Sequence, residues 1–131
     1  MIFGVGIDLI EVDRIEKAIS ANESFRQKVF SIREINKCET SNNIYQCLAA
    51  RFAGKEAFMK ALGTGWAKGL KWSEIEILND DDGKPLMLLS GKTKQITMEL
   101  AVTRINVSLT HLAAMAAAVV ILETDSQQPN Y

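Results

Sequence analysis

The chain has 131 residues, 47% hydrophobic and 24% charged, and this composition predicts one domain with a modest core, spanning residues 1–131. Its 15 basic and 16 acidic residues give a net charge of −1, which argues against a general nucleic-acid-binding protein. No apolar run approaches the roughly 18 residues that a membrane-spanning helix needs. Neither nucleic acid nor membrane is therefore an expected partner.

The ends of the chain and its cysteines favour a cytoplasmic protein. The opening MIFGVGIDLIEV lacks a basic region and is interrupted by Asp8 and Glu11, which is not typical of a signal peptide. Cys38 and Cys47 do not have a zinc-binding spacing with the one histidine. We therefore expect two free thiols and a reducing compartment. The residues from about 124 to 131 are polar and predict a frayed tail.

The first predicted element is a mostly buried strand over Ile2–Ile10, which is rich in β-branched and apolar residues. Gly4 and Gly6 weaken a strand, so they indicate either a bulge or the close approach of another backbone. Asp8 lies inside this apolar run, where Asp is disfavoured. It either caps a turn or has a chemical role.

Short helices are predicted next. Two capping boxes predict one helix over residues 14–20 and another from Ser31 to about residue 38. Between them, the apolar spacing over residues 25–30 indicates a further helical turn. The two boxes are Asp13 with Glu16, and Ser31 with Glu34.

A long helix is predicted at the centre of the chain, N-capped by residues 41–43 and ended by residues 63–65. From residue 48 to residue 62 it is apolar nearly all the way round, and such a helix is normally buried. Four charges interrupt it. Glu56 and Lys60 stand four apart and share a face, so they form either an ordinary ion pair or part of a site. The other two charges are Arg51 and Lys55.

The second half of the chain is predicted to consist mainly of strands. Apolar residues between 72 and 88 fit two strands joined by the turn Asn79–Gly83, which makes a hairpin. A helix is predicted over Gly91–Ala101, followed by an alternating strand that ends in His111, the only histidine. Local propensity leaves residues 113–122 undecided between helix and strand.

Some of these residues suggest phosphoryl chemistry. Asp8 and Glu56 come from separate elements, and two carboxylates suffice for Mg²⁺ when phosphate and water complete its coordination. Lys60 could neutralise charge on phosphoryl oxygens or protonate a leaving group. Gly63 and Gly65 permit close backbone approach to an anion, although the dipole at a helix C-terminus opposes anion binding.

The chain resembles the holo-acyl-carrier-protein synthases, the small type of 4′-phosphopantetheinyl transferase. The segments GIDLIEVDRI, RFAGKEAFMKALGTG, WSEIEIL, DGKP and VSLTH follow in the family's order. The resemblance implies transfer of 4′-phosphopantetheine from coenzyme A to a serine of apo acyl carrier protein, releasing adenosine 3′,5′-bisphosphate. The alternative is a non-catalytic module that binds coenzyme A or carrier protein on the same scaffold. Intact Asp8, Glu56 and Lys60 argue against this alternative.

The resemblance also implies roles for individual residues. Asp8 and Glu56 match the magnesium ligands, and Glu56, or a water held by the metal, is the candidate base. Lys60 matches the lysine that contacts the pyrophosphate, and the three together form the expected catalytic set. Arg14 matches a position that docks the carrier protein. The positions matched to coenzyme A binding are Arg51, Lys60, Gly63, Gly65, Ser108, Thr110 and His111.

The implied fold is α+β, with antiparallel strands packed around a long central helix and with a strand over residues 113–122. Small members of the family are trimers with active sites between subunits. By this analogy, Asp8, Glu56 and Lys60 come from one chain and His111 comes from its neighbour. Gly54 departs from the family pattern, which usually has a small residue such as alanine there.

Overall fold

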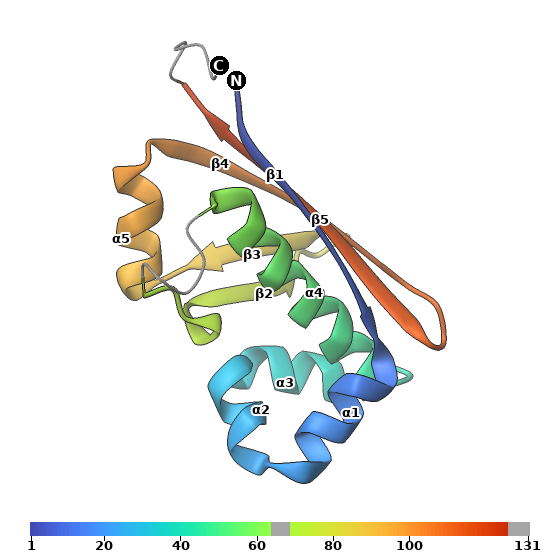
Figure 1. The fold of residues 1–131 in the computed structure, drawn as a ribbon. Helices are drawn as coiled ribbons and strands as arrows, with labels where there is room; N and C mark the ends of the chain where they lie inside the picture. The colour runs from blue at the N-terminus through green and yellow to red at the C-terminus, as the bar shows by residue number, and fades with distance from the viewer. Residues whose placement is uncertain (64–68, 126–131) are drawn as a thin grey trace.

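The computed structural model describes residues 1–63 and 69–125, and it confirms an α+β fold with antiparallel strands around a long helix. A three-stranded sheet has the order β1–β5–β4, and β2 and β3 form a separate hairpin. Figure 1 shows α4 lying along the sheet, with α1, α2 and α3 near one end of it. The elements are β1 (Ile2–Glu11), α1 (Val12–Ala21), α2 (Glu23–Val29), α3 (Ile32–Glu39), α4 (Ile44–Leu62), the short 3₁₀ helix η2 (Trp72–Glu74), β2 (Ile75–Asn79), β3 (Pro85–Leu89), α5 (Gly91–Glu99), β4 (Val102–His111) and β5 (Met115–Thr124).

Helix α4 is the buried centre of the molecule, as its all-round apolar pattern predicts. The side chain of Asn43 caps it by accepting hydrogen bonds from the backbone N–H groups of Tyr45 and Gln46. Gly63 ends it in the left-handed conformation, with φ of 80°. The helix packs on the inner face of the sheet, where Ala116 and Ala118 of β5 are buried. Small side chains there allow the helix and the sheet to approach closely.

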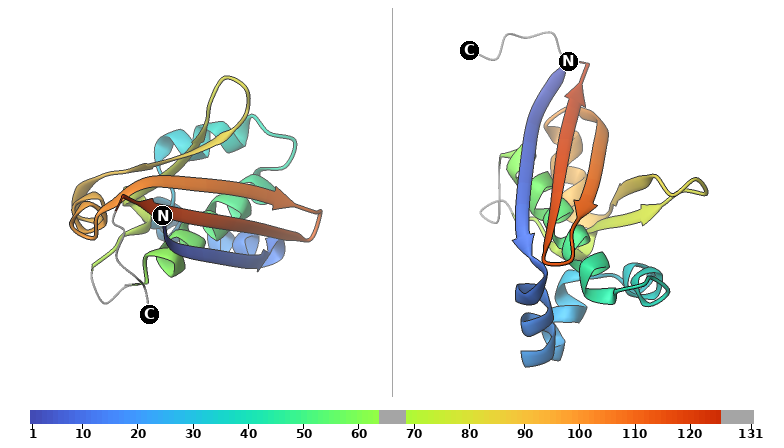
Figure 2. Two further views of the ribbon diagram at one scale, coloured as in Figure 1. Left: turned by 90° about the horizontal axis from the view of Figure 1, so that it is seen from above. Right: turned by 90° about the vertical axis from the view of Figure 1, so that its right-hand side faces the viewer.

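Strand β1 is not mostly buried, so that part of the sequence prediction is wrong. Only alternate residues face α4, because successive side chains of a strand point to opposite faces. Val5, Ile7 and Leu9 are 57%, 68% and 64% exposed on the other face. Figure 2 (right) looks onto this face, and none of the described elements covers it. We call it the outer face of the sheet.

The close backbone approach predicted at the glycines of β1 is present. A Cβ atom on Gly6 would overlap the carbonyl oxygen of Ala57, and one on Gly4 would overlap that of Ala61. Both obstacles are helix backbone, which cannot rotate away as a side chain can. The register of β1 against β5 also shifts between Ile2 and Gly4. The two readings of these glycines, a bulge and a close approach, therefore both hold.

We expect Gly6→Ala to lower the free energy of unfolding by about 3 kcal/mol, because the strand must move off α4 to admit a methyl group. Urea unfolding measures this change. Gly83→Ala is the matched control, since a Cβ there meets nothing within 4 Å and only the φ of 85° opposes it. That backbone conformation costs about 1 kcal/mol. Equal losses for the two variants would contradict the packing described here.

Several boundaries differ from the sequence prediction for tertiary reasons. Helix α1 begins at Val12 and its start makes no side-chain capping bond, so the predicted Asp13 box is wrong. Instead, the N–H of Val12 donates to the carbonyl of Ala114 at 2.9 Å. The Ser31 box is confirmed. Thr124 belongs to β5 and is buried, so it is not part of a tail.

A buried ion pair joins the helices to the hairpin. Lys55 is fully buried, and its ammonium donates to Glu34 Oε1 at 2.7 Å and to the carbonyls of Val29 and Trp72 at 2.6 and 3.0 Å. The second oxygen of Glu34 accepts from the N–H of Ile77 at 3.0 Å. Burial lowers the pKa of Lys55, and the Glu34 carboxylate opposes this effect. These bonds use all three donors of the ammonium and tie four segments to α4.

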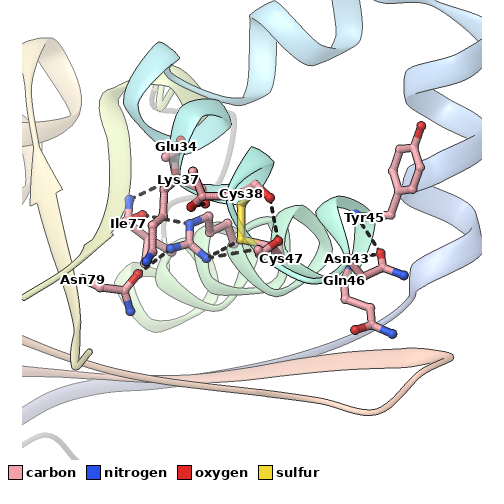
Figure 3. The surroundings of a disulfide bond; sticks show 12 residues. Glu34, Lys37, Cys38, Asn43, Tyr45, Gln46, Cys47, Ile77 and Asn79 are labelled. Carbon is pink, nitrogen blue, oxygen red and sulfur yellow. Dashed lines mark hydrogen bonds between the residues drawn. A yellow bond between two sulfur atoms is a disulfide. The ribbon is translucent and has the colours of Figure 1, made fainter. Parts of the chain in front are cut away.

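The two cysteines form a disulfide, so the expectation of two free thiols is wrong. Cys38 lies in the last turn of α3 and Cys47 in the first turn of α4 (Figure 3). The chain reverses between the two helices and brings the Cα atoms of Cys38 and Cys47 to 5.4 Å from each other, a usual separation for a disulfide. The cysteines therefore no longer indicate a reducing compartment.

Reducing this disulfide is expected to lower the free energy of unfolding by about 2–3 kcal/mol, because the bond closes a short loop and restricts the unfolded chain. Urea unfolding with and without dithiothreitol measures the change. The Cys38→Ser/Cys47→Ser double variant is the control and should not respond to the reductant. An oxidised wild type no more stable than the double variant would contradict this contribution.

Candidate active site

Asp8, Glu56 and Arg14 come from three different elements and line one cavity. Asp8 lies on the inner face of β1, Glu56 on α4, and Arg14 on α1. The cavity has a volume of about 460 Å³, and the aromatic side chains in its wall are Phe25, Phe52 and Trp72. We call it the carboxylate cavity. It unites the two predicted metal ligands with the predicted carrier-docking arginine.

Lys60 pairs with Asp8 and not with Glu56, so the ordinary ion pair within the helix is not what the structure shows. Its ammonium donates to Asp8 Oδ1 and to the carbonyl of Ile7, both at 3.0 Å. The lysine side chain is 55% exposed, whereas that of Asp8 is only 16% exposed. Asp8 also lies well inside β1, which continues to Glu11, so it does not cap a turn. A cation thus lies at the surface beside a sheltered carboxylate.

Glu56 has a different partner, which the sequence analysis missed. Its Oε1 accepts a hydrogen bond from the indole Nε1 of Trp72 at 3.0 Å. The Trp72 ring packs against Phe52 with their centroids 5.9 Å apart. The sequence pattern placed Trp72 in the first strand of the hairpin, but it lies in η2, just before β2.

The donor set of the carboxylate cavity fits a hard, oxygen-preferring cation. Within residues 1–63 and 69–125, no cluster of three or more His, Cys, Asp or Glu side chains could hold a metal ion. Among the described residues that line the cavity, the carboxylates are Asp8 and Glu56. Mg²⁺ commonly binds through one or two carboxylates plus substrate phosphates and water.

A second cavity, of about 500 Å³, contains Arg51 and His111. It lies beside β4, at the opposite edge of the sheet from Asp8. Arg51 is only 5% exposed, and it donates to the Ile77 carbonyl at 3.1 Å and to Asn79 Oδ1 at 2.6 Å. Its Nη1 also donates to the sulfur of Cys47 at 3.2 Å. Burial lowers the pKa of Arg51, and Glu34 opposes this effect.

The remaining predicted coenzyme A residues are not gathered in this second cavity. Ser108 and Thr110 pair with Val119 and Ala117 of β5, on the outer face, whereas His111 pairs with Ala116 on the inner face. Gly63 ends α4, and a Cβ there would meet no atom within 4 Å. Gly65 lies outside the described residues.

A family model described as the 4′-phosphopantetheinyl transferase superfamily matches residues 4–120. The chain belongs to this superfamily. It is 44% identical to the holo-[acyl-carrier-protein] synthase of Geotalea daltonii over 124 residues, which cover 94% of this chain and 99% of that protein. The resemblance seen in the sequence is thereby confirmed.

Solved structures of the same family share the fold. The holo-[acyl-carrier-protein] synthase of Neisseria meningitidis matches with a TM-score of 0.87 and 28% identity. The match covers 95% of this chain and 100% of that chain. The Helicobacter pylori synthase, solved in complex with coenzyme A, matches with a TM-score of 0.79 and 32% identity. The match covers 91% of this chain and 99% of that chain.

In this phosphopantetheinyl transferase superfamily member, the predicted site residues therefore form two groups. Asp8, Glu56, Lys60 and Arg14 gather at the β1 edge of the sheet, and Arg51 and His111 gather at the β4 edge. Helix α4 packs between them on the inner face of the sheet and carries residues of both groups. In the part of the chain that the structure describes, no helix is both long and apolar enough to cross a membrane.

Proposed function

We propose that this chain transfers 4′-phosphopantetheine from coenzyme A to a serine of an apo acyl carrier protein. The observation that carries the proposal is the nearly full-length similarity to holo-[acyl-carrier-protein] synthases, one of them solved with coenzyme A. The carboxylate cavity supports it, because Asp8, Glu56 and Lys60 suit phosphoryl transfer. The non-catalytic alternative gains no support from a chain that keeps Asp8, Glu56 and Lys60.

The bond changes follow from the substrates. The serine oxygen attacks the pantetheine-side phosphorus of the coenzyme A pyrophosphate, and the bond from that phosphorus to the bridging oxygen breaks. Adenosine 3′,5′-bisphosphate leaves. Glu56 accepts the serine proton, and Lys60 binds the pyrophosphate oxygens through its exposed ammonium. Mg²⁺, with Asp8 and Glu56 as its protein ligands, would neutralise the charge on those oxygens.

The proposal assigns Arg51 and His111 to the 3′-phosphate of coenzyme A, because they share the second cavity. Ser108 and Thr110 lie on the other face of the same strand end and would contact coenzyme A only at a junction between chains. Gly63 and Gly65 are proposed to let the coenzyme approach the backbone beyond α4.

His111→Ala is expected to reduce the preference for coenzyme A over its 3′-dephospho form about tenfold, because one donor to the 3′-phosphate is lost. The ratio of kcat/KM values for the two donors measures it. Asn36→Ala, on the surface of α3 and in neither site cavity, is the control. An unchanged ratio in His111→Ala would remove the histidine from the phosphate site.

We propose a homotrimer whose active sites lie between subunits. The outer face of the sheet supports this, since Val5, Ile7 and Leu9 are more than half exposed and would be covered by association. The two site cavities also lie at opposite edges of one chain, so a neighbour is well placed to complete each site. Mixing Glu56→Gln chains with His111→Ala chains tests this: mixed trimers should recover the wild-type preference for coenzyme A over its 3′-dephospho form, and stable active monomers would exclude it.

Arg14 is proposed to dock the acidic carrier protein. It is exposed on α1 and lines the carboxylate cavity, and with Lys17 it also lines an adjoining cavity of about 370 Å³. Cations beside the reacting groups would attract an acidic partner and make KM for the carrier sensitive to salt. A cytoplasmic location is part of the proposal, and cell fractionation tests it.

The experiment that tests the function follows the released nucleotide. The protein is mixed with coenzyme A, Mg²⁺ and apo carrier protein, and adenosine 3′,5′-bisphosphate is measured by chromatography. We expect its release only with the apo carrier, and none with a carrier whose acceptor serine is replaced by alanine. Binding of both partners without release would support the non-catalytic module instead.

A further inference from the structure

The indole of Trp72 and the carboxylate of Glu56 meet in the wall of the carboxylate cavity. The Nε1–H of Trp72 donates to Glu56 Oε1 at 3.0 Å, from η2 to α4. Trp72 is itself held firmly. Its carbonyl accepts from the buried ammonium of Lys55 at 3.0 Å, and its ring packs on Phe52. The donor therefore belongs to a rigid segment, whereas glutamate alone has several freely rotating bonds.

We propose that Trp72 is a positioning residue that holds Glu56 in its working orientation. This inference rests on the proposed transferase function. An indole N–H donates but cannot accept, so it occupies one carboxylate oxygen without competing for a cation. The other oxygen of Glu56 stays available for the ion or for the serine proton. Fixing the side chain in advance removes part of the rotamer entropy that glutamate would otherwise lose on binding.

Two variants of Trp72 distinguish a positioning role from simple packing. Trp72→Phe keeps an aromatic ring against Phe52 but removes the donor, so it should leave the fold intact and free the Glu56 carboxylate. Removing the hydrogen-bond partner of a metal-binding side chain typically lowers metal affinity or activity about 10–100-fold. We therefore expect about tenfold weaker Mg²⁺ binding in Trp72→Phe and a lower kcat. Trp72→His, which retains a ring N–H, should recover part of the loss.

The test measures Mg²⁺ binding by calorimetry with coenzyme A present and carrier absent, so that no turnover occurs. Wild type, Trp72→Phe, Glu56→Ala and the double variant form a cycle. We expect Trp72→Phe to weaken binding only when Glu56 is present, with an unchanged urea midpoint. Equal Mg²⁺ affinity in wild type and Trp72→Phe would overturn the proposal, and so would equal weakening in the Glu56→Ala background.

The two proposals fail in distinguishable ways. If the wild type binds Mg²⁺ but transfers no phosphopantetheine, the proposed function is wrong, and the cycle still decides whether Trp72 acts through Glu56. If the wild type transfers the group and the cycle shows no coupling, only the role of Trp72 is wrong.

Discussion

Glu56→Gln is expected to lower the rate of phosphopantetheine transfer about a thousandfold, which is within the range for loss of a general base. Glutamine has nearly the same shape, and its side-chain oxygen can still accept from Trp72. The fold should therefore survive while the negative charge and the proton acceptor are lost. Initial rates with saturating coenzyme A and carrier protein measure the effect.

The control for this experiment is Glu99→Gln, which makes the same chemical change on the exposed surface of α5. Its rate should match that of the wild type. Urea unfolding of both variants checks that the fold is intact. A Glu56→Gln protein that turns over at the wild-type rate would show that this carboxylate has no catalytic role.

Lys55→Met is expected to lower the free energy of unfolding by about 3–5 kcal/mol, because it leaves the fully buried Glu34 carboxylate without its counter-ion. That loss would consume much of the 5–15 kcal/mol by which native proteins are stable. The cost arises from the unpaired charge rather than from the missing contact. Urea unfolding measures it.

Two further variants separate charge from packing. Lys94→Met removes an exposed lysine of α5 and should change stability by less than about 0.5 kcal/mol. Adding Glu34→Gln to Lys55→Met should restore part of the loss, since no charge then remains buried. A Lys55→Met protein as stable as Lys94→Met would contradict the structural role of this pair.

Local sequence patterns predicted correctly the elements that depend on interactions between residues close together in the chain. The all-round apolar pattern of α4, the Ser31 capping box and the alternation of β4 all hold in the structure. Local propensity left the β5 segment undecided, because its alanines favour helix and its later residues favour strand. The strand was predicted from the family resemblance instead. Its state is decided by pairing with β1 and β4 on both sides.

What the sequence could not supply were contacts between distant segments. The Lys55–Glu34 pair spans 21 residues, and neither side chain shows from its neighbours that it will be buried. The bond from Trp72 to Glu56 likewise depends on how η2 packs against α4. The disulfide was missed because two cysteines nine residues apart give no sign that the chain reverses between them.

The glycine in the centre of α4 now has a physical reason. A Cβ on Gly54 would lie 2.5 Å from Cδ1 of Ile77 and 3.2 Å from Cδ2 of Leu109. The ends of these two side chains, from β2 and β4, occupy the space that a side chain at this position would need. Glycine lowers helix propensity by about 1 kcal/mol relative to alanine, but alanine would have to displace two packed side chains.

The most direct test of the account is the mass of an apo carrier protein after incubation with this protein, coenzyme A and Mg²⁺. We expect the carrier to gain the mass of one phosphopantetheine group on its acceptor serine. We expect no gain when Glu56→Gln replaces the wild type over the same time. Unmodified carrier with the wild type, across several carriers, would contradict the transferase assignment.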